Sequence, residues 1–301
     1  MDDCNRIQFA HPDLPRLTEH YTVVDLHFHS IYSDGRDRVE AIADQAAALG
    51  IGVALTDHNA IEGAVAISAF KDILTIPGIE VTSREGAHIL LYFYDIDTLA
   101  LFFEKEIAPY RGRDVMCPVA RSPETLIRRA GHYGAVVIFP HPCCGFYTGI
   151  ANPQTDPRRL EKLLNMAHGV EVINSENLNK WNLKCALLGF NLNKAVSGGS
   201  DGHALYQLGK VVSYADCPPR CADFLNALKK KQIKVVGKEI DILRKVRSNG
   251  HKLRTSLKHA PDIVEKNINY SYKVINIKSR SLTNRVRNSI NEKMRRSAKH
   301  S

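Results

Sequence analysis

The chain has 301 residues, 44% of them hydrophobic, which is enough to bury the core of one large domain with an extension. No apolar run is long enough to cross a bilayer, and the first residues lack the apolar core of a signal peptide, so we expect a cytoplasmic protein without membrane contact. Seven cysteines without a framework spacing indicate reduced thiols rather than a disulfide scaffold.

The positive charge lies at the C-terminal end. The whole chain has a net charge of +9. Residues 241–301 carry 16 Lys+Arg and 4 Asp+Glu, a net charge of +12, which leaves 25 basic and 28 acidic residues, a net charge of −3, for residues 1–240. A charge argument for nucleic-acid contact therefore concerns only this extension. A solvated tail is the simpler interpretation, and contact with an anionic polymer is the alternative.

Strand and helix patterns alternate along residues 21–237. Apolar strand patterns cover residues 21–29, 51–55, 73–81, 87–94, 135–139, 170–173, 194–197, 210–214 and 233–236. Helical patterns cover residues 38–49, 61–70, 99–107, 122–133, 156–166, 179–188 and 220–231. Nearly continuous apolar strands separated by helices predict a parallel sheet covered by helices, for which a closed (β/α) barrel and an open doubly wound sheet are both possible.

Residues that can bind metal stand at the ends of many of these strands. They are His27, His29, Asp34, His58, Glu80, His141, Asp201 and His203. The strand ends of a barrel converge at one mouth, whereas an open sheet spreads them along an edge, so this pattern favours the barrel.

A histidine pair is the clearest single feature. His27 and His29 are two residues apart, so on a strand their side chains point to the same face. A lone pair of this kind is commonly structural. Six histidines near strand ends, together with three carboxylates, would be costly to bury without a cation. Mixed imidazole and carboxylate ligands suit Mn²⁺, Zn²⁺ or Fe²⁺.

Five short motifs resemble, in order, those of the PHP (polymerase and histidinol phosphatase) family. They are DLHFHSIYSDG at residues 25–35, TDHN at 56–59, PGIE at 77–80, FPHP at 139–142 and GSDGH at 199–203. The resemblance implies α/β architecture as a distorted (β/α)7 TIM-like barrel, the PHP fold. We therefore expect an N-terminal strap over residues 1–20, the barrel over 21–237 and a basic, partly helical C-terminal extension over 238–301.

The resemblance also implies nine ligands for two or three divalent ions. One ion would take His27, His29, Glu80 and Asp201; a second would share Glu80 and add His88 and His141; a third would take Asp34, His58 and His203. Asp201 and His203 are the candidate catalytic acid–base residues. Asp25 is expected to orient a histidine rather than to bind an ion.

The implied activity is hydrolysis of a phosphate ester by attack of a metal-bound hydroxide at a di- or trinuclear site. The Ser33-Asp34-Gly35 form is similar to members that act on nucleotides, so a nucleotide, a nucleoside bisphosphate or an oligonucleotide end is the expected substrate. A histidinol-phosphatase-like phosphomonoesterase and a non-catalytic PHP scaffold with a nucleic-acid-binding tail are the alternatives. The candidate substrate-binding residues are Arg84, Arg111, Arg113, Arg121 and Asn174, although surface solvation alone explains any one arginine.

Overall fold

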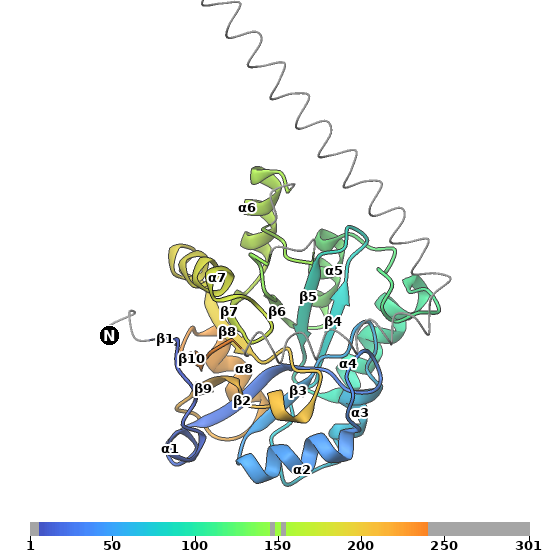
Figure 1. Cartoon of the computed structure of the whole chain (residues 1–301). Coiled ribbons are helices and arrows are strands. Elements are labelled where there is room, and N and C mark those ends of the chain that lie inside the picture. The colour runs from blue at the N-terminus through green and yellow to red at the C-terminus, as the bar shows by residue number, and fades with distance from the viewer. Residues whose placement is uncertain (1–5, 145–147, 152–154, 240–301) are drawn as a thin grey trace, which may run out of the picture. The chain divides into compact units, whose positions relative to one another are not determined.

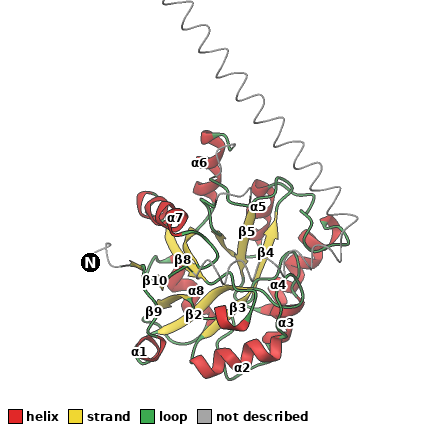
Figure 2. Ribbon diagram, in the orientation of Figure 1, coloured by secondary structure: helices red, strands yellow, loops and turns green. Residues whose placement is uncertain are grey.

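The computed structural model describes residues 6–144, 148–151 and 155–239. The predicted extension lies outside the described residues from position 240 onward, so its helices are not tested. Among the described residues, no helix is both long and apolar enough to span a bilayer. Figures 1 and 2 show strands in the middle of this part of the chain, with helices such as α2 and α7 around them.

The strands form two five-stranded sheets. The first has the order β1-β10-β9-β2-β3 and the second β4-β5-β6-β7-β8. The first sheet contains β1 (Ile7–Gln8), β2 (Thr22–Phe28), β3 (Gly52–Leu55), β9 (Val211–Ala215) and β10 (Lys234–Gly237). The second contains β4 (Gly78–Thr82), β5 (His88–Tyr92), β6 (Val136–Phe139), β7 (Gly169–Asn174) and β8 (Ala195–Gly199).

The helices follow the predicted pattern closely. They are α1 (Leu14–Thr18), α2 (Val39–Leu49), α3 (Glu62–Ile67), α4 (Ile96–Phe102), the π-helix η2 (Phe103–Ile107), the 3₁₀ turns η3 (Ala108–Tyr110) and η4 (Leu205–Gln207), α5 (Pro123–His132), α6 (Pro157–Met166), α7 (Asn179–Asn191) and α8 (Cys221–Lys229). Ser122 and Asp156 cap α5 and α6 as their Ser-Pro and Asp-Pro pairs predict. Residues 7–8 and 14–18 of the predicted strap are themselves regular, as β1 and α1.

The sheets are mixed, which corrects the expectation of a parallel sheet. Strand β5 runs antiparallel to both β4 and β6, and β9 runs antiparallel to β2 and β10. Five residues, 83–87, join β4 to β5, and so short a link cannot contain the crossover that parallel neighbours need. The described residues therefore form an α/β fold of two sheets, and they contain no single closed barrel of parallel strands.

The two sheets meet where the motif residues lie. Isolated parallel bridges join Phe28 to Gly202 and His58 to Glu80. Glycine is needed at this junction of the two sheets, which we call the seam. A Cβ on Gly199 would lie 2.3 Å from the His27 Cβ, and one on Gly202 would lie 2.3 Å from the Phe28 ring. Two buried hydrophobic clusters support the seam, one extending through the second sheet and one between the first sheet and α2.

Candidate metal centre

The nine predicted ligands come from strands of both sheets and converge at the seam. His27 lies in β2, Glu80 in β4 and His88 at the start of β5. The others follow strand ends: His29 and Asp34 after β2, His58 after β3, His141 after β6, and Asp201 and His203 after β8. His141 and Asp201 have left-handed backbones, with φ of 32° and 51°, a conformation that is strained for residues with a Cβ and clusters at functional sites.

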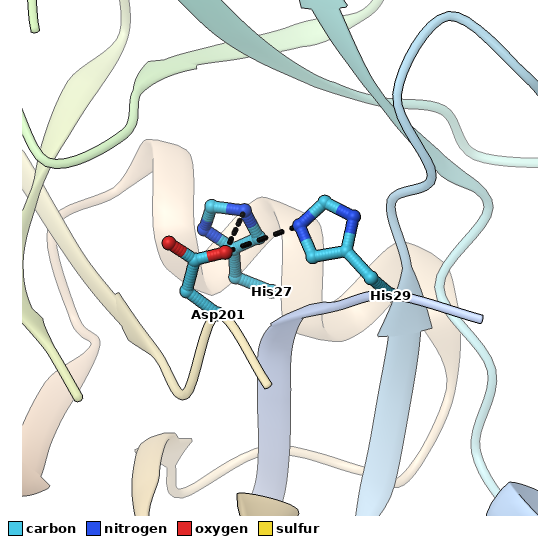
Figure 3. A group of neighbouring side chains, drawn as sticks. All are labelled: His27, His29 and Asp201. Carbon is cyan, nitrogen blue, oxygen red and sulfur yellow. Dashed lines mark hydrogen bonds and ion pairs between the residues drawn. The ribbon is translucent and has the colours of Figure 1, made fainter. Parts of the chain in front are cut away.

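Asp201 joins the two histidines of β2. Its Oδ1 lies 3.1 Å from His29 Nε2 and 3.4 Å from His27 Nε2. Figure 3 shows both imidazole rings directed at this one carboxylate oxygen. Both histidines are fully buried. The predicted common face of His27 and His29 is thus seen, with a carboxylate from the other sheet completing a three-ligand group.

Glu80 is the centre of the cluster, because its carboxylate faces five imidazoles. Its Oε1 lies 2.8 Å from His88 Nδ1 and 3.4 Å from His141 Nε2. Its Oε2 lies 3.1 Å from His58 Nδ1 and 3.4 Å from the Nε2 atoms of His27 and His29. A buried carboxylate that bridges so many potential ligands is suited to sharing between ions.

Asp34 gathers the third part of the cluster. Its Oδ2 lies 3.0 Å from His203 Nε2, and its Oδ1 lies 3.7 Å from His29 Nδ1 and 3.8 Å from His58 Nε2. His58 is therefore nearer to Glu80, at 3.1 Å, than to Asp34, with which the sequence grouped it. The groups able to hold an ion are His27-His29-Asp201, His29-Asp34-His203, His29-His58-Glu80 and Glu80-His88-His141.

Buried ligand atoms that make no hydrogen bond test whether this cluster fits metal ions. Five ligand atoms in the cluster are buried and make no hydrogen bond: His27 Nε2, Asp34 Oδ1, His58 Nδ1, His141 Nδ1 and His203 Nε2. An ion-pair contact without hydrogen-bond geometry leaves a buried polar atom incompletely satisfied, and coordination to a cation would remove that cost. The donor set of imidazoles and carboxylates therefore fits divalent ions.

The electrostatics keep the carboxylates ionised. Burial alone would raise the pKa of Glu80, but the imidazoles of His88, His58 and His27 outweigh it and hold this pKa well below its usual value. In the same way, His203 and His58 hold the pKa of Asp34 well below its usual value against the effect of burial. Anionic ligands are the form that a cation needs.

The imidazoles of the cluster are perturbed in both directions. Burial lowers the pKa of His58 to about 3, and the carboxylates of Glu80 and Asp34 only partly offset it. Burial also lowers the pKa of His27, but the charges of Asp201, Glu171 and Glu80 outweigh it and raise this pKa well above its usual value. The neutral imidazole of His58 is thus already in the state that binds metal.

Glu171 is a residue of this centre that the sequence analysis missed. It is buried in β7, and its Oε1 accepts a hydrogen bond from His27 Nδ1 at 3.0 Å. Its Oε2 accepts from the His141 backbone N–H at 2.8 Å and from Asn174 Nδ2 at 2.9 Å. With Nδ1–H directed at Glu171, the Nε2 lone pair of His27 faces the cluster, the arrangement typical of metal-ligating histidines. The available signal was an acidic residue inside an otherwise apolar strand.

Two other buried aspartates hold the loops that carry ligands. Asp57 accepts from the backbone N–H of Ser30 at 2.8 Å and from the Ser33 hydroxyl at 2.7 Å. Asp25 accepts from the Ser200 hydroxyl at 2.6 Å and the Ser200 N–H at 2.9 Å. Asp25 thus ties β2 to the end of β8, and its Oδ1 also accepts from the His27 backbone N–H at 3.3 Å, so it holds His27 through the backbone rather than through the imidazole.

The predicted substrate-binding residues are not brought together. Asn174 lies in the centre, where its Nδ2 donates to Glu171 and, at 3.2 Å, to Asp201 Oδ2. Arg111 donates to the Asn59 carbonyl at 2.9 Å, next to His58.

The other arginines have different surroundings. Arg84 is 65% exposed and pairs with Glu85, Arg113 is exposed, and Arg121 pairs with Glu106 and lies over the Tyr110 ring.

Comparisons with known proteins agree with the motifs. Residues 25–111 match the PHP domain family model, which confirms the resemblance. No curated protein matches the chain.

Several solved structures share the fold. A two-domain protein from Bacteroides vulgatus ATCC 8482 containing a predicted PHP-like metal-dependent phosphoesterase is 20% identical, with TM-score 0.53, covering 80% of this chain and 72% of that chain. PsfC from Pseudomonas syringae PB-5123 is 18% identical, with TM-score 0.56 and coverages of 79% and 99%. Endonuclease Q in complex with a 27-mer duplex substrate with an abasic lesion is 15% identical, with TM-score 0.58 and coverages of 73% and 60%.

Proposed function

We propose that this chain, a PHP-domain hydrolase of phosphate ester bonds, acts on a nucleotide, a nucleoside bisphosphate or an oligonucleotide end. The observation that carries the proposal is the cluster around Glu80, in which nine buried or nearly buried ligands leave five atoms without a hydrogen-bond partner. An intact ligand set of this size argues against the alternative of a non-catalytic scaffold. Endonuclease Q, which shares the fold, has a 27-mer duplex with an abasic lesion as its substrate, and this supports a nucleic-acid or nucleotide substrate.

Divalent ions, when bound, supply Lewis-acid stabilisation of phosphoryl oxygens and lower the pKa of coordinated water. The nine ligands named above would hold two or three such ions, and Mn²⁺, Zn²⁺ and Fe²⁺ all suit the donor set. Glu171 would fix the ring of His27, and Asn174 would hold Glu171 and Asp201 in place through its amide.

Asp201 and His203, the two candidate acid–base residues, differ in what their side chains can donate. The charge of His27 and hydrogen bonding to His29 outweigh burial and hold the pKa of Asp201 well below its usual value, so its carboxylate is a poor acid and a good ligand. His203 Nδ1 lies 2.7 Å from the Asp201 backbone carbonyl, which can only accept, so Nδ1 carries a hydrogen. This tautomer leaves the Nε2 lone pair, 3.0 Å from Asp34, to bind an ion, so His203 could donate a proton from Nε2 only in a centre in which it is not a ligand.

The test is release of phosphate in the presence of Mn²⁺. The substrates are nucleoside monophosphates, nucleoside 3′,5′-bisphosphates, short oligonucleotides and histidinol phosphate. We expect release from the nucleotides by the wild-type chain and its loss in the double variant His27→Ala plus His29→Ala. His20→Ala is the matched control, because the His20 side chain is 68% exposed and lies outside the cluster.

Three results would contradict this proposal. Equal release by the wild-type chain and the double variant would remove the metal centre from the reaction. A wild-type chain that keeps no metal after gentle purification and takes up none on reloading would favour the scaffold. Release from histidinol phosphate alone would select the phosphomonoesterase alternative.

A further inference from the structure

Three large exposed side chains lie on the two loops that carry Asp34 and His203. We define this mouth patch as Ile31, Tyr32 and Tyr206, which are 45%, 42% and 41% exposed. Ile31 and Tyr32 follow His29 and Ser30 in the loop to Asp34, and Tyr206 lies in η4, three residues after His203. Large side chains left exposed on the loops that carry a polar site indicate a binding surface.

Backbone contacts hold the two loops against each other. The Arg36 N–H donates to the His203 carbonyl at 2.9 Å, and the Leu205 N–H donates to the Asp37 carboxylate at 2.8 Å. The Ile31 N–H donates to the Asp37 carbonyl at 3.2 Å, which closes the first loop on itself. The residues of the mouth patch therefore belong to the same two loops that bring Asp34 and His203 into contact.

Hydrogen bonds to buried side chains also hold the two turns that carry Tyr32 and Tyr206. Ser30 Oγ accepts from the Tyr32 N–H at 3.2 Å and itself donates to Asp57 at 2.7 Å. In η4, the fully buried Gln207 accepts from the His203 N–H at 2.8 Å and donates to Glu176. These bonds are made by neighbouring residues and by backbone, so they remain when either tyrosine ring is removed.

The chemistry of the two neighbouring surfaces defines the ligand. A cluster that holds cations attracts a phosphate, and flat exposed tyrosine rings offer stacking to any π-face. A phosphorylated nucleoside has both groups, with the base separated from the phosphate by one sugar. A sugar phosphate has the phosphate alone and would leave the rings in water.

We propose that Tyr32 and Tyr206, supported by Ile31, bind the nucleobase of a phosphorylated nucleoside whose phosphate lies at the Asp34–His203 side of the metal centre. This inference rests on the proposed function and deepens it, because it assigns the preference for nucleotides over other phosphate esters to named side chains. The neighbouring ligands Asp34 and His203 would contact the phosphate side, and the patch would contact the base.

The kinetic test compares adenosine 5′-monophosphate with ribose 5-phosphate in the presence of Mn²⁺. In the double variant Tyr32→Ala plus Tyr206→Ala, the KM for the nucleotide should rise by about 5- to 150-fold, the range expected for loss of base stacking. The KM for ribose 5-phosphate should stay the same. The variants Tyr32→Phe and Tyr206→Phe should keep the wild-type KM, since phenylalanine preserves the ring. Phe190→Ala removes an aromatic ring that is 54% exposed on α7 and serves as the control.

A binding measurement separates this inference from the proposed function. Calorimetric titration of the full chain with adenosine 5′-monophosphate and with ribose 5-phosphate measures binding affinity rather than phosphate release. It should give tighter binding of adenosine 5′-monophosphate. That difference should disappear in the double tyrosine variant. Equal affinity of the wild-type chain for both ligands, or an unchanged difference in the variant, would overturn the inference even if phosphate is released. Tighter nucleotide binding without phosphate release would uphold the patch and refute the proposed hydrolysis.

Discussion

Replacing Glu171 by glutamine tests how the centre is organised outside its ligands. The carboxylate accepts hydrogen bonds from His27 Nδ1, the His141 N–H and Asn174 Nδ2, at 3.0, 2.8 and 2.9 Å. Glutamine has nearly the same shape but no charge, and its amide nitrogen would face one of these three donors. The imidazole of His27 would become a weaker ligand, and one of the donors would lose its acceptor.

The expected loss in metal affinity is about 10- to 100-fold, as for other groups that orient a ligating histidine, which corresponds to about 1.4–2.7 kcal/mol. The metal-free variant should also lose about 1–3 kcal/mol of unfolding free energy, because a buried donor is left unpaired. Competition with a chromophoric chelator measures the affinity, and urea unfolding measures the stability. Glu161→Gln, at an exposed position of α6, is the matched control. A folded Glu171→Gln chain with unchanged metal affinity would refute the reasoning.

Three further predictions follow from the cluster and its surroundings. Glu80→Gln should abolish phosphate release and strongly weaken metal binding, because this carboxylate belongs to two ligand groups. Phosphate release at the wild-type rate, or unchanged metal affinity, would contradict this prediction. In the metal-free chain, the pKa of His58 is lowered from 6.5 to about 3, so the unfolded state binds the extra proton and stability falls as the pH drops from about 6.5 towards 3. His58→Gln should reduce this slope by up to about 1.4 kcal/mol per pH unit in urea titrations, and identical slopes would contradict it. Arg84→Ala should leave the KM unchanged, whereas Arg111→Ala should raise the KM by disturbing Asn59 next to His58. Equal KM values for the two variants in the phosphate-release assay would contradict this prediction.

The positions of the candidate ligands could be predicted because each motif lies within or directly after an apolar strand. The runs before His29, His58 and His141 are strands in the structure, and Pro123 and Pro157 begin helices where expected. Periodicity does not carry strand direction, however, so β5 was not expected to run antiparallel. The five-residue link before it was the available clue.

Sequence patterns could not predict hydrogen-bond partners that are distant along the chain. Glu171 meets His27 across 144 positions, and nothing in the local spacing selects that carboxylate among the others. Arg84 shows the opposite failure. It is close to Glu80 in sequence, but β4 ends at Thr82, so the turn carries its side chain to the surface rather than to the cluster.

The sharing of ligands has a consequence for how the centre fills. Glu80 belongs to two of the groups that can hold an ion, and His29 belongs to three. An ion bound in one group therefore changes the charge and the mobility of a side chain that a neighbouring group also uses. By thermodynamic linkage, this influence must be equal in both directions. The centre should therefore load cooperatively or anticooperatively, and its titration with a single kind of ion should depart from the isotherm of independent sites.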